Sequence, residues 1–241
     1  MKSINNFFYF ILFAITFMNA RDCKAVKPIG SETVVDKDEN VYNIVKIGKQ
    51  TWMVENLKTT KYNDGTAIPL VTNNEEWSTL TSPGYCWYDN DAKNYKDSYG
   101  ALYNWYTVNT GKLAPIGWHV PNDTEWTILE NFVSSNLGTP DSLAKALSAT
   151  TSWTTYKSPS SIGNDLSKNN KSGFSALPGG CREVSNSGFI NVGYNGYWWS
   201  STEDGADFVW NRALHYYSSD LMKRYDPKFT GLSVRCIKDS Q

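Results

Sequence analysis

The chain has 241 residues, of which 40% are hydrophobic and 15% aromatic, with ten Trp and fifteen Tyr. This length fits one domain preceded by a short leader. The formal net charge of −1 supplies no excess positive field to collect phosphates, so nucleic acid and anionic membrane surfaces are excluded as expected partners.

The first 25 residues have the pattern of a secretory signal peptide. An apolar stretch from Phe7 to Met18 follows a lysine and precedes a polar break. This stretch is shorter than the roughly 20 residues that a membrane span needs. Cleavage after Ala20 or after Ala25 satisfies the preference for small residues, and both sites stay open. We expect export, with no transmembrane span in the mature chain.

Cys23 follows the apolar stretch, as the acylated cysteine of a bacterial lipoprotein does. Arg21 and Asp22 stand where that motif has small neutral residues. Lipidation of Cys23 is therefore the less favoured alternative to simple secretion.

Few side chains could hold a transition metal. The four cysteines contain no CxxC pair, which argues against a zinc site or a thioredoxin-type site. With only two histidines as further nitrogen ligands, we expect no metal and no cofactor. The residues concerned are Cys23, Cys86, Cys181, Cys236, His119 and His215.

The first half of the domain begins with predicted strands, after a short linker at residues 26–33. Residues 31–50 contain a β-rich run, a polar turn and alternating apolar positions from Val41 to Ile47, which predicts a hairpin. Residues 63–65 (Asn-Asp-Gly) then predict a tight turn, because Asp-Gly supplies the positive φ that such turns need.

Helices are predicted next. Residues 99–108 place Leu102, Trp105 and Tyr106 at three-and-four spacing. A second helix begins at Asn122, where Glu125 three residues on completes a capping box. Its apolar face holds Trp126, Leu129, Val133 and Leu137, and Gly138 would end it. A third, shorter helix is predicted within residues 140–149, with Thr139 as its cap and Pro140 in its first turn.

The second half is predicted to be a loop followed by strands. Residues 150–175 are polar and rich in Ser, Thr, Asn and Gly, which predicts a long ordered loop. From Phe174 onward, short β-type runs alternate with glycines, and no long helix is expected.

Seven motifs, in this order, resemble one known family. They are VKIGKQTWMVENLKTTKYNDGTAIP, YCWYDND, YGALYNWYTVN, GWHVPNDTEWTILE, GFSALPGGCRE, GYWWSST and GLSVRCIK. The chain resembles the Fibrobacter succinogenes major paralogous domain over residues 34–239. That family occurs in exported bacterial proteins, has no assigned biochemical function and is distantly similar to C-type-lectin-like and formylglycine-generating-enzyme folds.

The resemblance implies an α+β, C-type-lectin-like fold in which two main helices pack on small twisted antiparallel sheets with long loops. The chemistry of the related folds does not carry over. Sugar-binding lectins hold calcium with a Trp-Asn-Asp strand, where this chain has Arg212 after Trp210 and Asn211, and it has no Glu-Pro-Asn loop. Formylglycine-generating enzymes hold copper between two thiolates, and this chain offers Cys181 alone in that segment.

The cysteines raise two expectations. Because Cys86 and Cys236 lie in the family motifs and export permits disulfides, we expect them to pair, with two buried thiols as the alternative. Cys181 is then free or joined to Cys23. A Cys–His nucleophile is disfavoured, because His119 lies in a structural-looking segment and His215 on a strand.

Acidic residues give no convincing site. Asp89, Asn90 and Asp91 offer oxygen ligands to calcium, but the EF-hand spacing fails at Lys93, so a solvated turn is favoured. Glu125 is interpreted as a capping residue. Glu183, Glu203 and Asp204 are expected to lie in loops, and the sequence alone assigns them no role.

Aromatic residues are the best candidates for binding a ligand. Alternation along residues 196–202 turns Trp198 to one side and Tyr197 and Trp199 to the other. Since helices can cover only one face of a small sheet, some rings should reach the surface and stack on a ligand, although core packing is the alternative for each. The candidates are Tyr197, Trp199, Tyr216, Tyr217 and Tyr225.

These observations favour a secreted or cell-surface, non-catalytic bacterial module that binds a carbohydrate or another surface protein. Two alternatives stay open. One is an enzyme related to the formylglycine-generating group, and the other is a structural component of the envelope or of an adhesin.

Overall fold

The computed structural model describes residues 28–137, 143–183 and 188–240. The expected signal peptide, Cys23, and the expected helix end at Gly138 and cap at Thr139 lie outside the described residues. Strand β1 (Pro28–Val35) begins within the stretch that was expected to be a linker.

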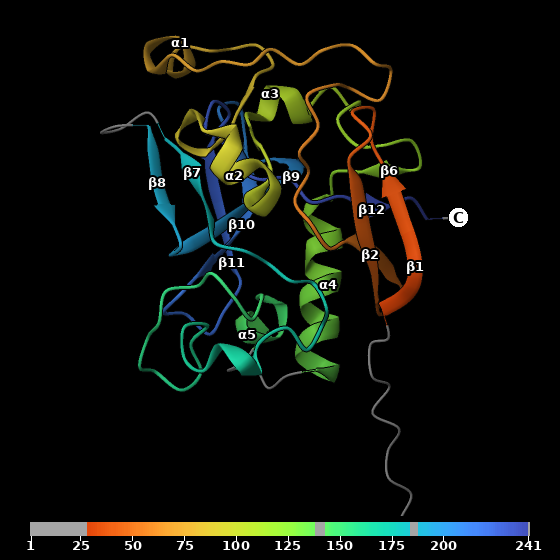
Figure 1. The fold of residues 1–241 in the computed structure, drawn as a ribbon, viewed down its shortest axis with the longest axis vertical. Coiled ribbons are helices and arrows are strands. Elements are labelled where there is room, and N and C mark those ends of the chain that lie inside the picture. The colour runs from red at the N-terminus through yellow and green to blue at the C-terminus, as the bar shows by residue number, and fades with distance from the viewer. Residues whose placement is uncertain (1–27, 138–142, 184–187, 241) are drawn as a thin grey trace, which may run out of the picture.

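The first sheet joins the two ends of the domain, in the order β1-β2-β3-β12-β6 (Figure 1). All its pairs are antiparallel, and Ile237 near the C-terminus pairs with both Trp52 and His119. The predicted hairpin is confirmed, because Val35 pairs with Val41 across a turn. The other strands are β2 (Val41–Ile47), β3 (Gln50–Met53), β6 (Trp118–His119) and β12 (Ile237–Lys238).

The second sheet is built from the C-terminal half, in the order β11-β10-β9-β7-β8. Its pairs are antiparallel except the short parallel contact between β7 and β9 at Gly180 and Gly196. The strands are β7 (Gly179–Arg182), β8 (Phe189–Val192), β9 (Asn195–Glu203), β10 (Phe208–His215) and β11 (Met222–Pro227).

Most helices are short. Helix α4 (Asp123–Asn136) has 14 residues, whereas the other described α-helices have four to eight. The predicted capping box is confirmed, since the Asn122 side chain accepts from the Glu125 backbone and the Glu125 side chain accepts from the Asn122 backbone. The other elements are α1 (Asn74–Ser78), β4 (Tyr85–Cys86), α2 (Ala92–Tyr99), β5 (Leu102–Tyr103), α3 (Trp105–Val108) and α5 (Leu143–Leu147), with 3-10 turns at Tyr88–Asn90 and Leu166–Lys168.

The expected α+β class with two main helices is wrong. The molecule is mostly β, with two curled sheets, and only α4 approaches the expected size. The predicted helix at 99–108 is divided: Gly100 has a φ of 76°, Tyr103 pairs with Tyr85, and a new helix starts after Asn104. The three-and-four spacing is a coincidence of two short elements: Leu102 of β5 and Trp105 of α3 are buried in different core clusters, and Tyr106 is only partly buried.

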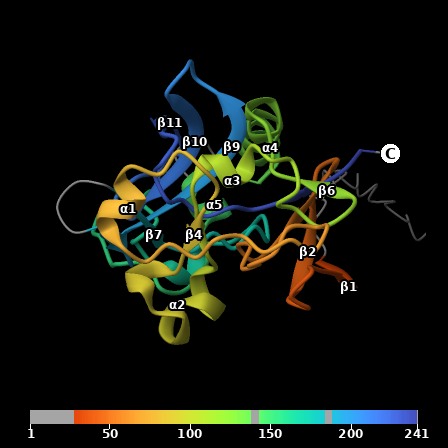
Figure 2. The same ribbon diagram turned by 90° about the horizontal axis from the view of Figure 1, so that it is seen from above.

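Helix α4 lies between the two sheets and contacts β2, β9 and β10 (Figure 1). Its buried residues Trp126, Leu129 and Val133 pack with Trp52 from the first sheet and Trp198 from the second. A second core cluster contains Tyr103, Trp105 and Trp199. Figure 2 shows α2 and the β9–β11 strands on opposite sides of the molecule.

Candidate functional site

Strand register assigns the side chains of the second sheet to two faces. Asn195, Tyr197 and Trp199 of β9 stand directly opposite His215, Ala213 and Asn211 of β10. Directly paired residues project to the same side of a sheet, and Arg224 of β11 pairs with Asn211 in the same way. We call this side the Tyr197 face; the residues used below are Asn195, Tyr197, Asn211, Ala213, His215, Arg224 and Asp226.

Helix α4 covers the opposite face. Trp198 and Leu214 pack there in the core cluster of the helix. Arg212 is 1% exposed and forms ion pairs with Asp123 and Glu130 of α4. Arg212 therefore fixes helix to sheet, and its position after Asn211 serves packing.

A buried polar pair on the Tyr197 face has unused hydrogen-bonding capacity. His215 is 6% exposed and Asn195 is 9% exposed, and the two residues are cross-strand partners. Neither His215 Nε2 nor Asn195 Oδ1 has a hydrogen-bond partner among the described residues. Buried polar atoms without partners cost free energy, so this pair is suited to receive a ligand's polar groups.

His215 is neutral at ordinary pH. Burial and then the charge of Arg224 lower its pKa below the usual 6.5. Its Nδ1 lies 2.9 Å from the hydroxyl of Tyr217. That contact leaves Nε2 as the ring nitrogen that is free to bind.

The Tyr197 hydroxyl holds two asparagine side chains in place on this face. Its hydroxyl accepts hydrogen bonds from Asn191 Nδ2 at 3.0 Å and Asn195 Nδ2 at 2.9 Å. Burial raises the pKa of Tyr197 to about 12. The bond to Asn195 Nδ2 orients that amide and leaves its Oδ1 as the unpartnered acceptor.

A tyrosine cluster borders the polar pair. Its members are Tyr156, Tyr194, Tyr216 and Tyr217, with neighbouring ring centroids 5.3 to 6.2 Å apart. Tyr156, Tyr194 and Tyr217 are each 44 to 48% exposed. Backbone bonds from Tyr216 N to Tyr194 O and from Gly163 N to Tyr216 O hold the contributing segments together.

The five aromatic candidates from the sequence fall into three groups. Tyr216 and Tyr217 belong to the tyrosine cluster. Tyr225 is 56% exposed but packs against Phe208 and Trp210 on the opposite face of the sheet. Tyr197 and Trp199 are core residues, which corrects the expectation that they could stack on a ligand. Trp199 is 0% exposed, and its Nε1 donates to the carbonyl of Tyr103, a segment nearly a hundred residues away.

Two of these site residues, His215 and Asn195, carry no sequence motif that predicts a binding role. The available signal was parity: positions 195, 197 and 199 share one side of a strand, as do 211, 213 and 215. The alternation does not show which residues of the two strands pair, so it could not predict that the two sets lie side by side.

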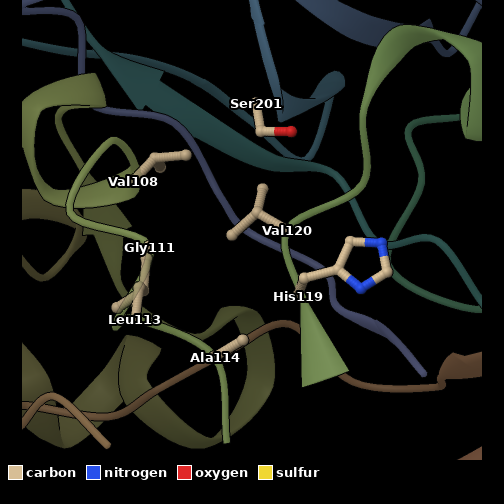
Figure 3. Close-up of a pocket in the computed structure, with 7 residues that line it drawn as sticks. All are labelled: Val108, Gly111, Leu113, Ala114, His119, Val120 and Ser201. Carbon is tan, nitrogen blue, oxygen red and sulfur yellow. The ribbon is translucent and has the colours of Figure 1, made fainter. Parts of the chain in front are cut away.

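A separate pocket lies beside His119 (Figure 3). It has a volume of about 160 Å³ and is lined mainly by apolar groups, which is small beside typical ligand pockets of roughly 300–1,000 Å³. Figure 3 shows Val108, Leu113, Ala114 and Val120 around the pocket and the imidazole of His119 turned away from the first three.

Both nitrogens of His119 are occupied. Nε2 lies 2.8 Å from Glu125 Oε1, and Nδ1 lies 2.6 Å from Asp239 Oδ1. The hydrogen bond with Glu125, opposed by burial and aided by Asp239, raises the pKa of His119 to about 9. A protonated imidazole is not available as a general base, and the two carboxylates give His119 a structural role between β6, α4 and Asp239.

The expected disulfide is absent. Cys86 and Cys236 are both free, buried thiols and lie in different core clusters. Cys181 is also free and buried, and its other proposed partner, Cys23, lies outside the described residues. Burial raises the pKa of Cys86 to about 12 and raises those of Cys181 and Cys236 as well.

The acidic turn has a local role. Asp89 and Asn90 adopt φ values of 51° and 56°, and Asp91 caps α2 by accepting from the backbone of Asn94. Within the described ranges, no group of three or more His, Cys, Asp or Glu residues could hold a metal ion.

No described helix is both long and apolar enough to cross a membrane.

Comparison with known proteins shows which family the chain belongs to. No curated protein and no solved structure matched the chain. The family model described as the Fibrobacter succinogenes major domain matches residues 45–238, which confirms the resemblance seen in the sequence motifs: the chain belongs to this family.

Proposed function

We propose that this chain is a non-catalytic binding module that takes carbohydrate on the Tyr197 face, beside the tyrosine cluster. One observation carries the proposal. Exposed Tyr217 contacts buried His215, whose Nε2 lacks a partner, as does Oδ1 of the neighbouring Asn195.

The chemistry of this arrangement suits a sugar. Hydroxyl groups both donate and accept hydrogen bonds, so they can serve the Asn195 oxygen, which only accepts, and the His215 nitrogen. The C–H face of a sugar ring can pack on an exposed tyrosine, which combines an apolar ring with a polar hydroxyl. Pockets that fix a ligand commonly combine aromatic walls with a few placed polar groups in this way.

Catalysis finds little support among the same residues. The thiols have raised pKa values, and a thiol is nucleophilic only as its thiolate. A copper site of the formylglycine-generating type needs a second thiolate, whereas the hydrogen-bond contact described for the Cys181 thiol is the Glu183 carboxylate at 3.9 Å. These facts favour binding over turnover.

The N-terminal sequence supports a location outside the cytoplasm. We propose that residues 1–25 direct export, so that the module acts in secreted form or on the bacterial cell surface, where glycans are abundant. Lipidation at Cys23 is the less favoured route to the same surface, and a protein partner is the alternative ligand.

A glycan array tests the proposal. The mature protein should bind a subset of glycans, and Tyr217→Ala should weaken the strongest interaction at least tenfold, about 1.4 kcal/mol. Tyr217→Phe keeps the ring and should lose less. Tyr225→Ala removes a ring of similar exposure, 56% against 46% for Tyr217, from the opposite face and serves as the matched control.

The variants should melt at temperatures close to that of the wild type, since both tyrosines are about half exposed. Absence of any glycan binding would contradict the proposal. Loss of binding in Tyr225→Ala with none in Tyr217→Ala would move the site to the other face.

A further inference from the structure

The Tyr197 face carries a second unpartnered acceptor, away from the tyrosine cluster. Asn211 is 0% exposed, and its Nδ2 donates to Asp226 Oδ2 at 2.8 Å. Its Oδ1 has no hydrogen-bond partner among the described residues. Asn211 and His215 are four residues apart on β10 and project to the same side, so they are separated by about 13 Å. This distance exceeds the width of one sugar ring.

Arg224 stands opposite Asn211 with its donors unused. The other described arginines, Arg182, Arg212 and Arg235, are buried and hydrogen-bonded. Arg224 is exposed, and it makes no hydrogen bond or ion pair with the described part of the chain. Its charge acts on both His215 and Tyr197. It lowers the pKa of His215, as the larger effect of burial also does, and it lowers the pKa of Tyr197 against the larger effect of burial.

Asp226 supplies an acceptor beside this donor. It lies two residues from Arg224 on β11 and therefore projects to the same face. Glu183 also faces this region, since its charge acts on Asp226. A cation flanked by carboxylates offers donors and acceptors with little net positive charge, which suits neutral hydroxyl groups better than an anion.

Apolar side chains join the two polar ends. Ala213 lies between Asn211 and His215 on β10, with Tyr197 and Met222 as its cross-strand neighbours. Ala213 is 0% exposed and packs in a core cluster with Tyr197, so the partly buried Met222 is the apolar side chain that lies between the two polar ends.

We propose that Asn211, Arg224 and Asp226 form a second subsite of the same binding face, so that the ligand is a neutral oligosaccharide chain lying along β10. The His215 end holds one sugar unit beside the tyrosine cluster, and Arg224 binds hydroxyl groups of a unit further along. This inference rests on the proposed carbohydrate function and specifies the ligand's length.

Chain length gives the test. The probe is the oligosaccharide with the strongest array signal, together with its fragments down to the monosaccharide, titrated into the mature protein and followed by NMR so that weak binding is measured. Wild-type affinity should rise with length beyond one unit. Arg224→Met should weaken the longest probe at least tenfold and leave the monosaccharide unchanged.

Lys223→Met is the matched control. Lys223 precedes Arg224 and carries the same charge, but it projects to the opposite face, where its Nζ lies 3.9 Å from the Trp210 ring centroid. This variant should bind every fragment as the wild type does. Both residues are exposed, so unchanged melting temperatures should accompany both substitutions.

Three outcomes overturn the inference. If the monosaccharide binds wild-type protein as tightly as the longest probe, or if Arg224→Met weakens all lengths equally, the second subsite does not exist while the carbohydrate function stands. If no glycan of any length binds, the proposed function fails and the second subsite fails with it.

Discussion

His119 and His215 are the two histidines of the chain, and their surroundings shift their pKa values in opposite directions. His119 has a carboxylate on each ring nitrogen, whereas His215 is buried near the positive charge of Arg224. His119 is therefore stabilised as a cation, and it connects strand β6 to α4 and to Asp239. His215 is stabilised as a neutral ring beside the proposed ligand.

Two imidazole signals should therefore titrate far apart in an NMR experiment. We expect one midpoint near pH 9, for His119, and one below the ordinary 6.5, for His215. Glu125→Gln removes the largest cause of the upward shift and should bring the His119 midpoint down without moving that of His215. Two midpoints close to 6.5 would contradict this account of both residues.

The raised pKa of His119 also predicts a pH-dependent stability. Because the folded-state pKa lies above the unfolded value, the contribution is fully present below about pH 6.5 and is lost as the pH rises through about 9. His119→Gln should cost roughly 1 kcal/mol at pH 6, a modest figure because solvent screens this partly exposed group. Urea unfolding should show the cost shrinking by pH 10, and an equal cost at both values would oppose the prediction.

Among the elements, strand β7 depends on a glycine that allows β8 to come close. Gly180 has a φ of 64°, and an added Cβ would lie 2.4 Å from the Ile190 carbonyl oxygen and 2.7 Å from the Val192 nitrogen. Both atoms are backbone atoms of the neighbouring strand, so they cannot move aside locally.

Gly180→Ala should consequently be more destabilising than an alanine at an unhindered glycine. Gly205 has a φ of 91° with nothing within 4 Å of an added Cβ, so Gly205→Ala should cost only the backbone strain, roughly 1–2 kcal/mol. The overlap at Gly180 should add about 1–3 kcal/mol. Thermal melts of the two variants measure the difference, and equal losses would show that β8 does not approach β7 this closely.

Local patterns predicted some elements well. Val41–Ile47 alternates and forms β2 over the same residues, and the Asn122–Glu125 pair starts α4 as expected. Strand β11 carries no such pattern, because at the sheet edge its Lys223, Arg224 and Tyr225 are all exposed and no apolar alternation marks it. The sequence patterns that predicted elements correctly all involve residues that are close to one another in the sequence.

The site was less predictable than the elements. The sequence placed Tyr216 and Tyr217 among the candidates, but Trp199 looked equivalent to them. What buries Trp199 is its contact with Tyr103 and the β-bridge next to it that Trp198 makes with Ser233. Contacts between residues this far apart in the sequence produce no local sequence pattern. Alternation therefore predicted which side of the strand Trp199 faces, but not whether that side is exposed.

At the scale of the whole molecule, packing without cross-links holds the domain together. The described thiols are free and buried in the cores, and α4 packs between the two sheets. Disulfides are common in exported domains. The described part of this chain instead buries six tryptophans almost completely: Trp52, Trp77, Trp105, Trp126, Trp198 and Trp199.

Stability should therefore be independent of reductant. In a Cys23→Ser variant, which keeps only the three described thiols, the melting temperature should be the same with and without dithiothreitol. A disulfide closing the long loop from Cys86 to Cys236 would contribute roughly 2–4 kcal/mol. A clear fall in melting temperature on reduction would reveal such a bridge and contradict the arrangement described here.

The central claim is that ligand binds on the Tyr197 face, and the two histidines report on it directly. His215 lies in that face, while His119 borders the separate small pocket. On titration of the array's strongest oligosaccharide, the account predicts that the imidazole signals of His215 shift and those of His119 stay in place. Movement of His119 with an unchanged His215 would contradict the account.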